Sequence, residues 1–107
     1  MRRNKMNKAI LVGNLTRDVE AKNNAANFTI AVNRTFKNQD GEYDADFIRC
    51  VAFQKRAEIL RDYAKKGSKI AVEGWIKTRS YENDAGETRY VTEVEVENVE
   101  LLSKKDD

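Results

Sequence analysis

The chain has 107 residues, of which 40% are hydrophobic and 36% charged, with a formal net charge of +2, one cysteine and no histidine. This length fits one domain with a small core that partner subunits would help to stabilise. A lone Cys50 excludes an internal disulfide, the absence of histidine removes the usual zinc and imidazole chemistry, and no apolar run approaches the ~20 residues that span a bilayer. We therefore expect a cytoplasmic protein with no metal, no cofactor and no membrane contact.

The first half of the chain predicts three strands. Residues 8–15 contain a continuous apolar run that ends at Gly13 and Asn14, which is typical of a buried or strongly paired strand. Residues 27–32 alternate apolar and polar side chains with a period of two. The polar stretch that follows contains the reversal signal Asp40-Gly41, and β-rich spacing resumes over residues 46–53. A hairpin should therefore join the second and third strands.

The second half predicts a helix and two more strands. Residues 54–66 place apolar side chains at helical offsets and Gly67 is a fitting stop, while residues 69–81 and 90–96 flank a turn at 83–86. Five strands with one helix between the third and fourth is the layout of the OB-fold, a five-stranded Greek-key barrel that often binds oligonucleotides or oligosaccharides. A different small β-barrel with one helix would give a similar pattern.

The fourth predicted strand combines aromatic and cationic side chains on one face. Its alternation directs Ile70, Val72, Gly74, Ile76 and Thr78 inward, and leaves outside Trp75, Lys77, Arg79 and Tyr81. Single strands bind without sequence preference where bases stack on aromatic rings and cations follow the phosphates, and this face supplies both. The alternative is an aromatic stripe that packs against a neighbouring subunit, although the intervening cations argue against an interface core.

The third predicted strand repeats this arrangement. Its inward residues would be Ile48, Cys50 and Ala52, because an unpaired buried Arg49 would be costly, and its outward residues Phe47, Arg49, Val51 and Phe53. A core position remains the alternative for either phenylalanine. Phe36 has the phase of the core residues of its own strand, so a bend or bulge near Asn33 is needed to turn Arg34 and Phe36 outward.

Charge is uneven along the chain. Residues 1–66 carry a net charge of +6, whereas residues 67–107 carry −4. A basic surface built mainly from the first part is therefore expected, which suits a nucleic-acid partner better than the overall charge suggests.

Several segments, in one order along the chain, resemble the bacterial single-stranded DNA-binding proteins. They are residues 7–15 (NKAILVGNL), 31–36 (AVNRTF), 46–53 (DFIRCVAF), 66–68 (KGS), 72–74 (VEG), 78–83 (TRSYEN) and 90–94 (YVTEV). The resemblance covers about residues 6–102, and dispersed segments in a fixed order are more specific than any single motif. It implies sequence-independent binding and protection of single-stranded DNA in replication, recombination and repair.

The resemblance also implies which residues contact DNA. Stacking aromatics would be Phe36, Phe47, Phe53 and Tyr81; phosphate contacts would be Arg49, Lys55, Lys77, Arg79 and Arg89; secondary contacts would be Lys8, Arg34 and Lys66. Trp75 departs from the family, which usually has a polar residue at that position, and we expect it to add a stacking platform.

The resemblance further implies a homotetramer in which the first strand takes part in subunit pairing. Residues 1–103 would form the DNA-binding domain, with residues 1–5 as an N-terminal extension and 104–107 as a short charged stub. Family members commonly continue into a linker with an acidic tip that recruits replication and repair enzymes. We do not expect this chain to use that route, which fits a tail-truncated form or a short variant of phage or mobile-element origin.

Three other functions remain open at this point. An enzyme would have to use the carboxylates Asp40, Glu42, Asp44 and Asp46, which lie in a predicted loop without any histidine or arranged nucleophile, so we expect none. An OB-fold accessory protein of replication restart would be dimeric. A single-stranded RNA-binding protein would use the same stacking, because stacking alone does not distinguish RNA from DNA.

Overall fold

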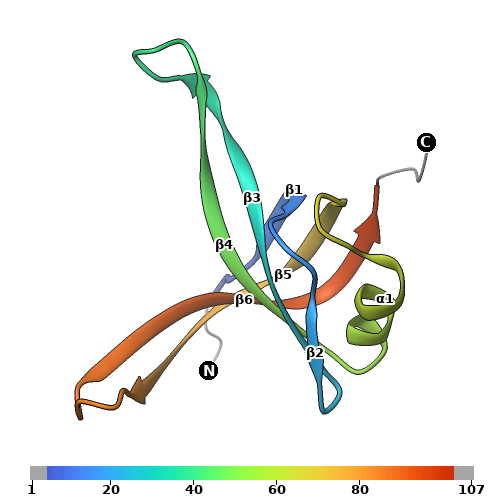
Figure 1. The fold of residues 1–107 in the computed structure, drawn as a ribbon, viewed down its shortest axis with the longest axis vertical. Helices are drawn as coiled ribbons and strands as arrows, with labels where there is room; N and C mark the ends of the chain where they lie inside the picture. Colours follow the sequence, from blue (N-terminus) through green and yellow to red (C-terminus); the bar gives the residue numbers. More distant parts are fainter. Residues whose placement is uncertain (1–4, 103–107) are drawn as a thin grey trace.

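The structure of the protein is a computed structural model, and it describes residues 5–102. The expectations for residues 1–4 and 103–107 lie outside the described residues. The elements along the chain are β1 (Ala9–Leu15), β2 (Glu20–Lys22), β3 (Ala25–Lys37), β4 (Tyr43–Phe53), α1 (Lys55–Tyr63), β5 (Lys69–Glu82) and β6 (Thr88–Leu101). Figure 1 shows the strands coiled around one centre, with α1 beside them and two long ribbons projecting outward.

The strands form one sheet that closes on itself. Their order is β1-β5-β6-β4-β3-β2, and β1 pairs additionally with β3 through Asn14 with Ala31 and Leu15 with Ile30. All pairings are antiparallel except the short parallel contact of β4 with β6. The five predicted strands are present, the helix lies between the third and fourth of them, and the closed barrel is an OB-fold. The short strand β2 was not predicted, because all three of its residues are exposed and carry no alternation.

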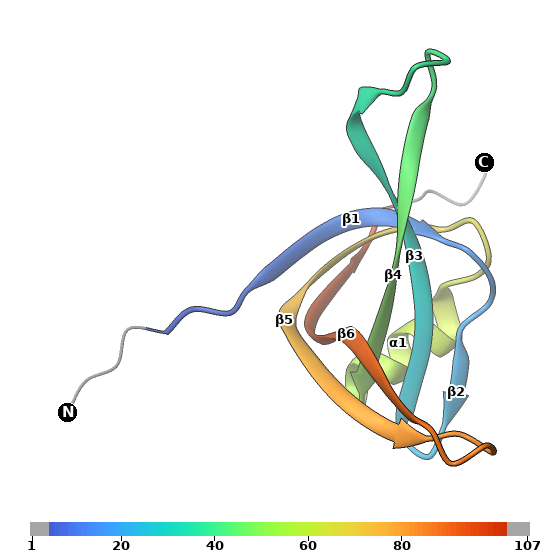
Figure 2. The same ribbon diagram turned by 90° about the vertical axis from the view of Figure 1, so that its left-hand side faces the viewer.

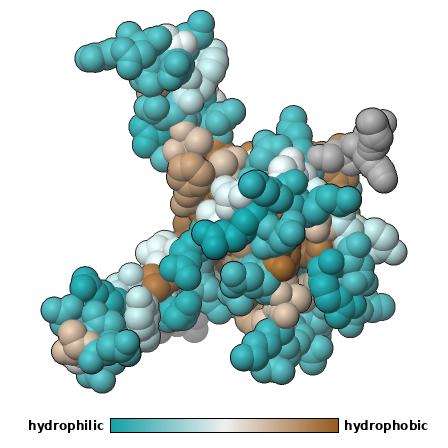
Figure 3. All heavy atoms as spheres, in the orientation of Figure 1, coloured by the Kyte–Doolittle hydropathy of each residue, from teal (hydrophilic) through white to brown (hydrophobic). Residues whose placement is uncertain are grey.

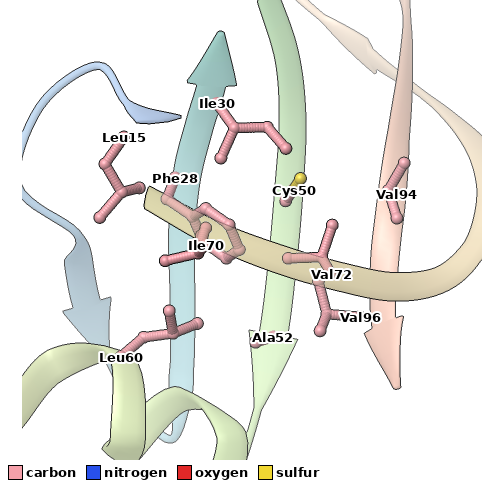
Figure 4. Packing of buried hydrophobic residues seen from close by; sticks show 10 residues of the cluster. All are labelled: Leu15, Phe28, Ile30, Cys50, Ala52, Leu60, Ile70, Val72, Val94 and Val96. Carbon is pink, nitrogen blue, oxygen red and sulfur yellow. The ribbon is translucent and has the colours of Figure 1, made fainter. Parts of the chain in front are cut away.

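The barrel interior holds a small apolar core. The largest fully buried side chains are Ile30, Leu60, Ile70 and Val72, and Figure 4 shows them together with Phe28, Cys50, Ala52, Val94 and Val96. Leu60 comes from α1, so the helix contributes to the core and covers one end of the barrel. The helix is shorter than the predicted 54–66, because the backbone at Ala64 is already extended.

At Gly74 the backbone of β6 lies too close to β5 for a side chain to fit. A Cβ atom at this position would lie 1.9 Å from the carbonyl oxygen of Glu95, and the β5–β6 register shifts between Glu73 and Gly74. Only a residue without a side chain fits there. Beyond this point the two strands leave the barrel together.

Two antiparallel ribbons extend beyond the barrel in different directions. We call residues 31–47 the β3–β4 ribbon and residues 75–95 the β5–β6 ribbon. In Figure 1 the first rises from the barrel and the second projects to the lower left, and Figure 2 again shows them apart. The β5–β6 ribbon keeps one unbroken register, whereas the β3–β4 ribbon is irregular between Asn33 and Lys37.

Both ribbons end in the same kind of turn. The turn sequences are NQDGE at 38–42 and NDAGE at 83–87. Asn38 Oδ1 accepts hydrogen bonds from the backbone N–H groups two and four residues later, and Asn83 Oδ1 does the same. Gly41 and Gly86 both have a φ of 81°, the left-handed region that glycine adopts most easily. The predicted reversals at Asp40-Gly41 and 83–86 are confirmed.

Two inward assignments were wrong, and one outward residue is buried. Ile76 was predicted to face the core but is 46% exposed, and Thr78 is exposed too, because β5 has left the barrel at this point. Val51 keeps the predicted outward phase, yet it is buried. It lies on the outer face of an inner strand between Asn27 and Glu95, whose longer side chains flank it.

Candidate nucleic-acid interface

The outer face of β4, β6 and β5 brings the two predicted groups of aromatics and cations together. The register places Val51 opposite Glu95, and Glu95 opposite Trp75, so the three strands present one continuous row. Lys77 Nζ lies 5.6 Å from the centroid of the Phe53 ring, a cation–π contact between the third and fourth predicted strands. The face that unites these strands is called the barrel face below.

Trp75 is half-buried in the barrel face rather than fully open. The next residue, Ile76, is fixed by a side chain from outside the sheet: Asn7 Nδ2 donates to its carbonyl at 2.7 Å, and its N–H donates to Asn7 Oδ1 at 2.9 Å. These two hydrogen bonds resemble those that a paired residue of a neighbouring β-strand would form with Ile76. The backbone next to Trp75 is therefore held in place where β5 leaves the barrel.

Phe36 and Phe47 lie on the β3–β4 ribbon, and each is 69% exposed. The irregularity expected near Asn33 is present, and both Arg34 and Phe36 are exposed beyond it. Phe47 shares its strand phase with Phe53, six residues and thus roughly 20 Å further along β4. In Figure 3 hydrophobic residues gather where this ribbon joins the barrel, while its end is mostly hydrophilic.

Tyr81 lies near the end of the β5–β6 ribbon and is 48% exposed. It is directly opposite Arg89, whose guanidinium pairs with Glu87 at 2.9 Å. The predicted aromatics are therefore distributed: Phe53 and Trp75 share the barrel face, and the others lie on two ribbons that point different ways.

Most of the predicted cations are already paired with carboxylates. On the barrel face Lys77 pairs with Glu95 at 3.0 Å and Arg79 with Glu93 at 2.8 Å. Elsewhere the pairs are Lys8 with Glu73 and Glu97, Arg34 with Asp46, and Arg89 with Glu87. Arg49, Lys55 and Lys66 form no ion pair within residues 5–102. The sequence analysis did not predict that Glu93 and Glu95 pair with the cations of β5. The alternation of β6 alone does not reveal which β5 residues lie beside its carboxylates.

Two of these ion pairs lower the pKa of their carboxyl group. The hydrogen bond from Arg34 holds the pKa of the Asp46 carboxyl below its usual value, and the hydrogen bond from Lys8 does the same to the pKa of Glu73. Both carboxylates thus stay ionised in mildly acidic solution. A phosphate that contacts Arg34 or Lys8 must compete with a charged partner.

A cleft of about 360 Å³ opens beside the barrel face. Arg49 and Arg79 line it together with Arg17 from the segment between β1 and β2, and the buried Glu93 lies at its wall. Cys50 also lines it, but burial raises the pKa of this thiol to about 12, and the nearby Glu93 carboxylate adds to the shift. The thiol is therefore protonated and chemically inert at neutral pH. Arg17 was not assigned from the sequence, because it lies in a loop without strand phase.

An OB-fold barrel whose outer face alternates aromatic and cationic side chains belongs to the class of oligonucleotide-binding barrels. The model of the Single-strand binding protein family matches residues 6–102. The chain belongs to this family.

Named relatives agree with this assignment. "Single-stranded DNA-binding protein 1" of Streptococcus pyogenes is 51% identical over 94% of this chain and 82% of its own length. "Single-stranded DNA-binding protein A" of Bacillus subtilis is 49% identical over 94% of this chain and 61% of its own length. "Single-stranded DNA-binding protein 3" of Streptococcus agalactiae is 47% identical over 94% of this chain and 76% of its own length.

The described part of the chain has neither a metal-binding cluster nor a membrane-spanning helix. Within residues 5–102, no group of three or more potential metal ligands lies close enough together to hold an ion. The helix in this part of the chain is not long and apolar enough to cross a membrane.

Proposed function

We propose that this protein binds single-stranded DNA without base preference and protects it during replication, recombination and repair. The observation that carries the proposal is the barrel face, where Phe53 and Trp75 lie among Lys77, Arg79 and Arg49. The family membership and the names of the relatives point to the same ligand. They describe binding and no reaction, which agrees with the expectation that the protein is not an enzyme.

Stacking supplies the part of the affinity that net charge does not explain. Each base stacked on an aromatic ring contributes roughly 1–3 kcal/mol and tolerates any sequence. We assign this role to Phe36, Phe47, Phe53, Trp75 and Tyr81. Phosphate contacts come from the cations named above, and most of these exchange an internal carboxylate for a phosphate, so their net contribution is smaller than that of a free cation.

The decisive test compares matched single-stranded and duplex oligonucleotides over a range of salt concentrations. Duplex should bind far more weakly, because paired bases expose no faces for stacking. Affinity for the single strand should fall as salt rises, because phosphate contacts release counterions. Equal affinity for the two forms would contradict stacking, and an affinity insensitive to salt would contradict the phosphate contacts.

Trp75 allows a direct spectroscopic test because it is the only tryptophan. Stacking of a base on indole normally quenches its emission, so saturation with oligo-dT should lower the tryptophan fluorescence, and Trp75→Ala should weaken binding. If Trp75 lies between subunits instead, its emission should follow dissociation of the oligomer and not DNA binding. Unchanged emission at full binding, with wild-type affinity for Trp75→Ala, would remove Trp75 from the site.

Stacking does not separate DNA from RNA, so a single-stranded RNA-binding function is the second candidate. Competition between DNA and RNA oligomers of the same sequence distinguishes the two. We expect DNA to win, in line with the names of the relatives. Preferential displacement by RNA would favour the second candidate.

The assembly we propose is a homotetramer in the cytoplasm, associated with the nucleoid. Its support is β1, where Ile10 is 70% and Val12 is 46% exposed, and where residues 9–13 pair with β5 on one side only within the described chain. An unpaired strand edge with apolar side chains suits pairing with a second copy. Solution mass by light scattering should give a tetramer, and a dimer would favour the replication-restart accessory protein.

A further inference from the structure

Arg17 lies in the segment between β1 and β2 and lines the cleft with Arg49 and Arg79. A role for it in binding rests on the proposed function, since it would be a further residue of the same DNA site. Three arginines from three separate parts of the chain therefore line one cleft. Such forked donors match phosphate oxygens well.

The charges in the cleft are not all available to a ligand. Arg79 already forms an ion pair with Glu93, with Arg79 Nε 2.8 Å from Glu93 Oε1. Arg17 and Arg49 form no ion pair within residues 5–102. Asp18 and Glu20 also line the cleft and are exposed, and neither forms an ion pair within the described residues, so Arg17 and Arg49 face two carboxylates there.

The Arg17 segment is anchored on both sides. On one side the N–H of Thr16 donates to the carbonyl of Thr29 at 3.0 Å, and its hydroxyl donates to the same oxygen at 3.2 Å. On the other side Asp18 Oδ1 accepts from the N–H of Lys66 at 2.7 Å, so this carboxylate is already engaged. The backbone that carries Arg17 is therefore held at the cleft before any ligand arrives, which reduces the entropy cost of a contact.

We propose that Arg17 contacts the bound strand and that, with Arg49, it grips one phosphodiester of that strand in this cleft. The volume of about 360 Å³ accommodates a phosphodiester with its flanking sugar atoms. The Arg79–Glu93 pair forms a wall of the cleft and leaves the two free guanidinium groups to meet the phosphate.

The test measures the affinity of Arg17→Ala for oligo-dT as a function of salt. A single-strand phosphate contact contributes about 0.7 to the slope of log affinity against log salt, so the slope should become less negative by about that amount per occupied site. Affinity at low salt should fall about tenfold, as expected for a lost charge-assisted hydrogen bond. Arg17→Lys keeps the charge and should keep most of the slope.

Arg61→Ala is the matched control, because it removes the same charge from α1, where Arg61 is exposed and pairs with Asp62 outside the cleft. Equal slopes for Arg17→Ala and Arg61→Ala, with intact binding by the wild type, would overturn this inference and leave the proposed function standing. If the wild type binds duplex DNA as tightly as single-stranded DNA, the proposed function is overturned instead.

A double-variant cycle tests the shared phosphodiester. If Arg17 and Arg49 grip the same group, the loss in Arg17→Ala/Arg49→Ala should be smaller than the product of the two single losses, because the first substitution already weakens the second contact. Losses that multiply independently would contradict a shared phosphodiester. Thermal unfolding should be alike in all variants, since both side chains lie at the surface of the open cleft.

Discussion

The two ribbons are alike at their ends and different along their lengths. Both end in an Asn-x-x-Gly-Glu turn with the same set of hydrogen bonds. The β5–β6 ribbon keeps its register from Gly74 with Val96 to Glu82 with Thr88, whereas the β3–β4 ribbon loses regular pairing between Asn33 and Lys37. The β5–β6 ribbon carries two cross-strand ion pairs at its base, Lys77–Glu95 and Arg79–Glu93, and the β3–β4 ribbon carries one, Arg34–Asp46.

This difference separates two ways of presenting aromatics to a ligand. The regular ribbon holds Trp75 and Tyr81 at fixed spacing on one strand phase. The irregular ribbon presents Phe36 and Phe47, both more exposed, on a backbone with fewer constraints. Two-stranded ribbons are only marginally stable on their own, so the attachment to the barrel decides how firmly each is held.

Gly74→Ala should have the largest effect, because it breaks the attachment of the β5–β6 ribbon. The new methyl group would collide with the Glu95 carbonyl, and neither backbone can move without losing strand pairing. We expect a loss of about 3 kcal/mol in the free energy of unfolding, measured by urea denaturation. A loss no larger than that of Gly86→Ala, whose methyl group meets no atom within 4 Å, would contradict this role.

Phe47→Ala and Tyr81→Ala compare the two ribbons as binding surfaces. Each should weaken oligo-dT binding by roughly 1–3 kcal/mol and change thermal stability little, because both rings are exposed. Fluorescence anisotropy with labelled oligonucleotide measures the affinity. A neutral Tyr81→Ala would confine stacking to the barrel face and the β3–β4 ribbon.

Phe53→Ala supplies the control from the barrel face, where the ring is 38% exposed. It should weaken binding as the ribbon variants do. A loss of roughly 3–5 kcal/mol in folding stability, typical of an emptied aromatic core position, would instead place Phe53 in the core.

The titration of Cys50 tests whether the core of the barrel that joins the two ribbons excludes water. The folded thiol keeps its proton up to a pKa of about 12, whereas the unfolded thiol loses it near about 8.5. Its contribution to stability is thus complete below about pH 8.5 and declines as pH rises, by about 1.4 kcal/mol per pH unit. Urea unfolding between about pH 9 and 10.5 should show this slope, and Cys50→Ala should be flatter by that amount. If the free energy of unfolding has the same slope against pH in the wild type and in Cys50→Ala, the thiol is hydrated in the folded protein.

Gly41→Ala and Gly86→Ala should have the smallest effects and should match each other. At a φ of 81° a methyl side chain costs roughly 1 kcal/mol, and at both positions no atom beyond the adjacent residues lies within 4 Å of the new carbon. Thermal unfolding of the two variants should agree within about 0.5 kcal/mol. A clear difference would show that the ribbons differ at their ends as well.

Much of the fold follows from local sequence. Alternation predicts the barrel strands, helical spacing predicts α1, and Gly41 and Gly86 locate the turns. The strand β2 escapes prediction because three exposed residues carry no pattern, and Ile76 was misplaced because periodicity shows which side chains share a face but not where a strand leaves the barrel.

The candidate site was predictable only along single strands. The outward phase of Arg49, Phe53 and Trp75 could be read from one strand at a time. The partners Glu93 and Glu95 could not, since cross-strand neighbours depend on register, which here includes a shift at Gly74. Arg17 depends on loop anchoring by distant residues, which no local pattern records.

The ion pairs of the barrel face have a consequence for how long DNA stays. Lys77 and Arg79 already have carboxylate partners, so if they contact DNA as proposed, a phosphate that leaves either cation would be replaced by Glu95 or Glu93. On the proposed function, the phosphate contacts of these two cations would therefore break singly and at a lower energetic cost than those of an unpaired cation. Such a surface would let a bound strand shift its position stepwise, while bases stacked on the proposed aromatic residues would keep it attached.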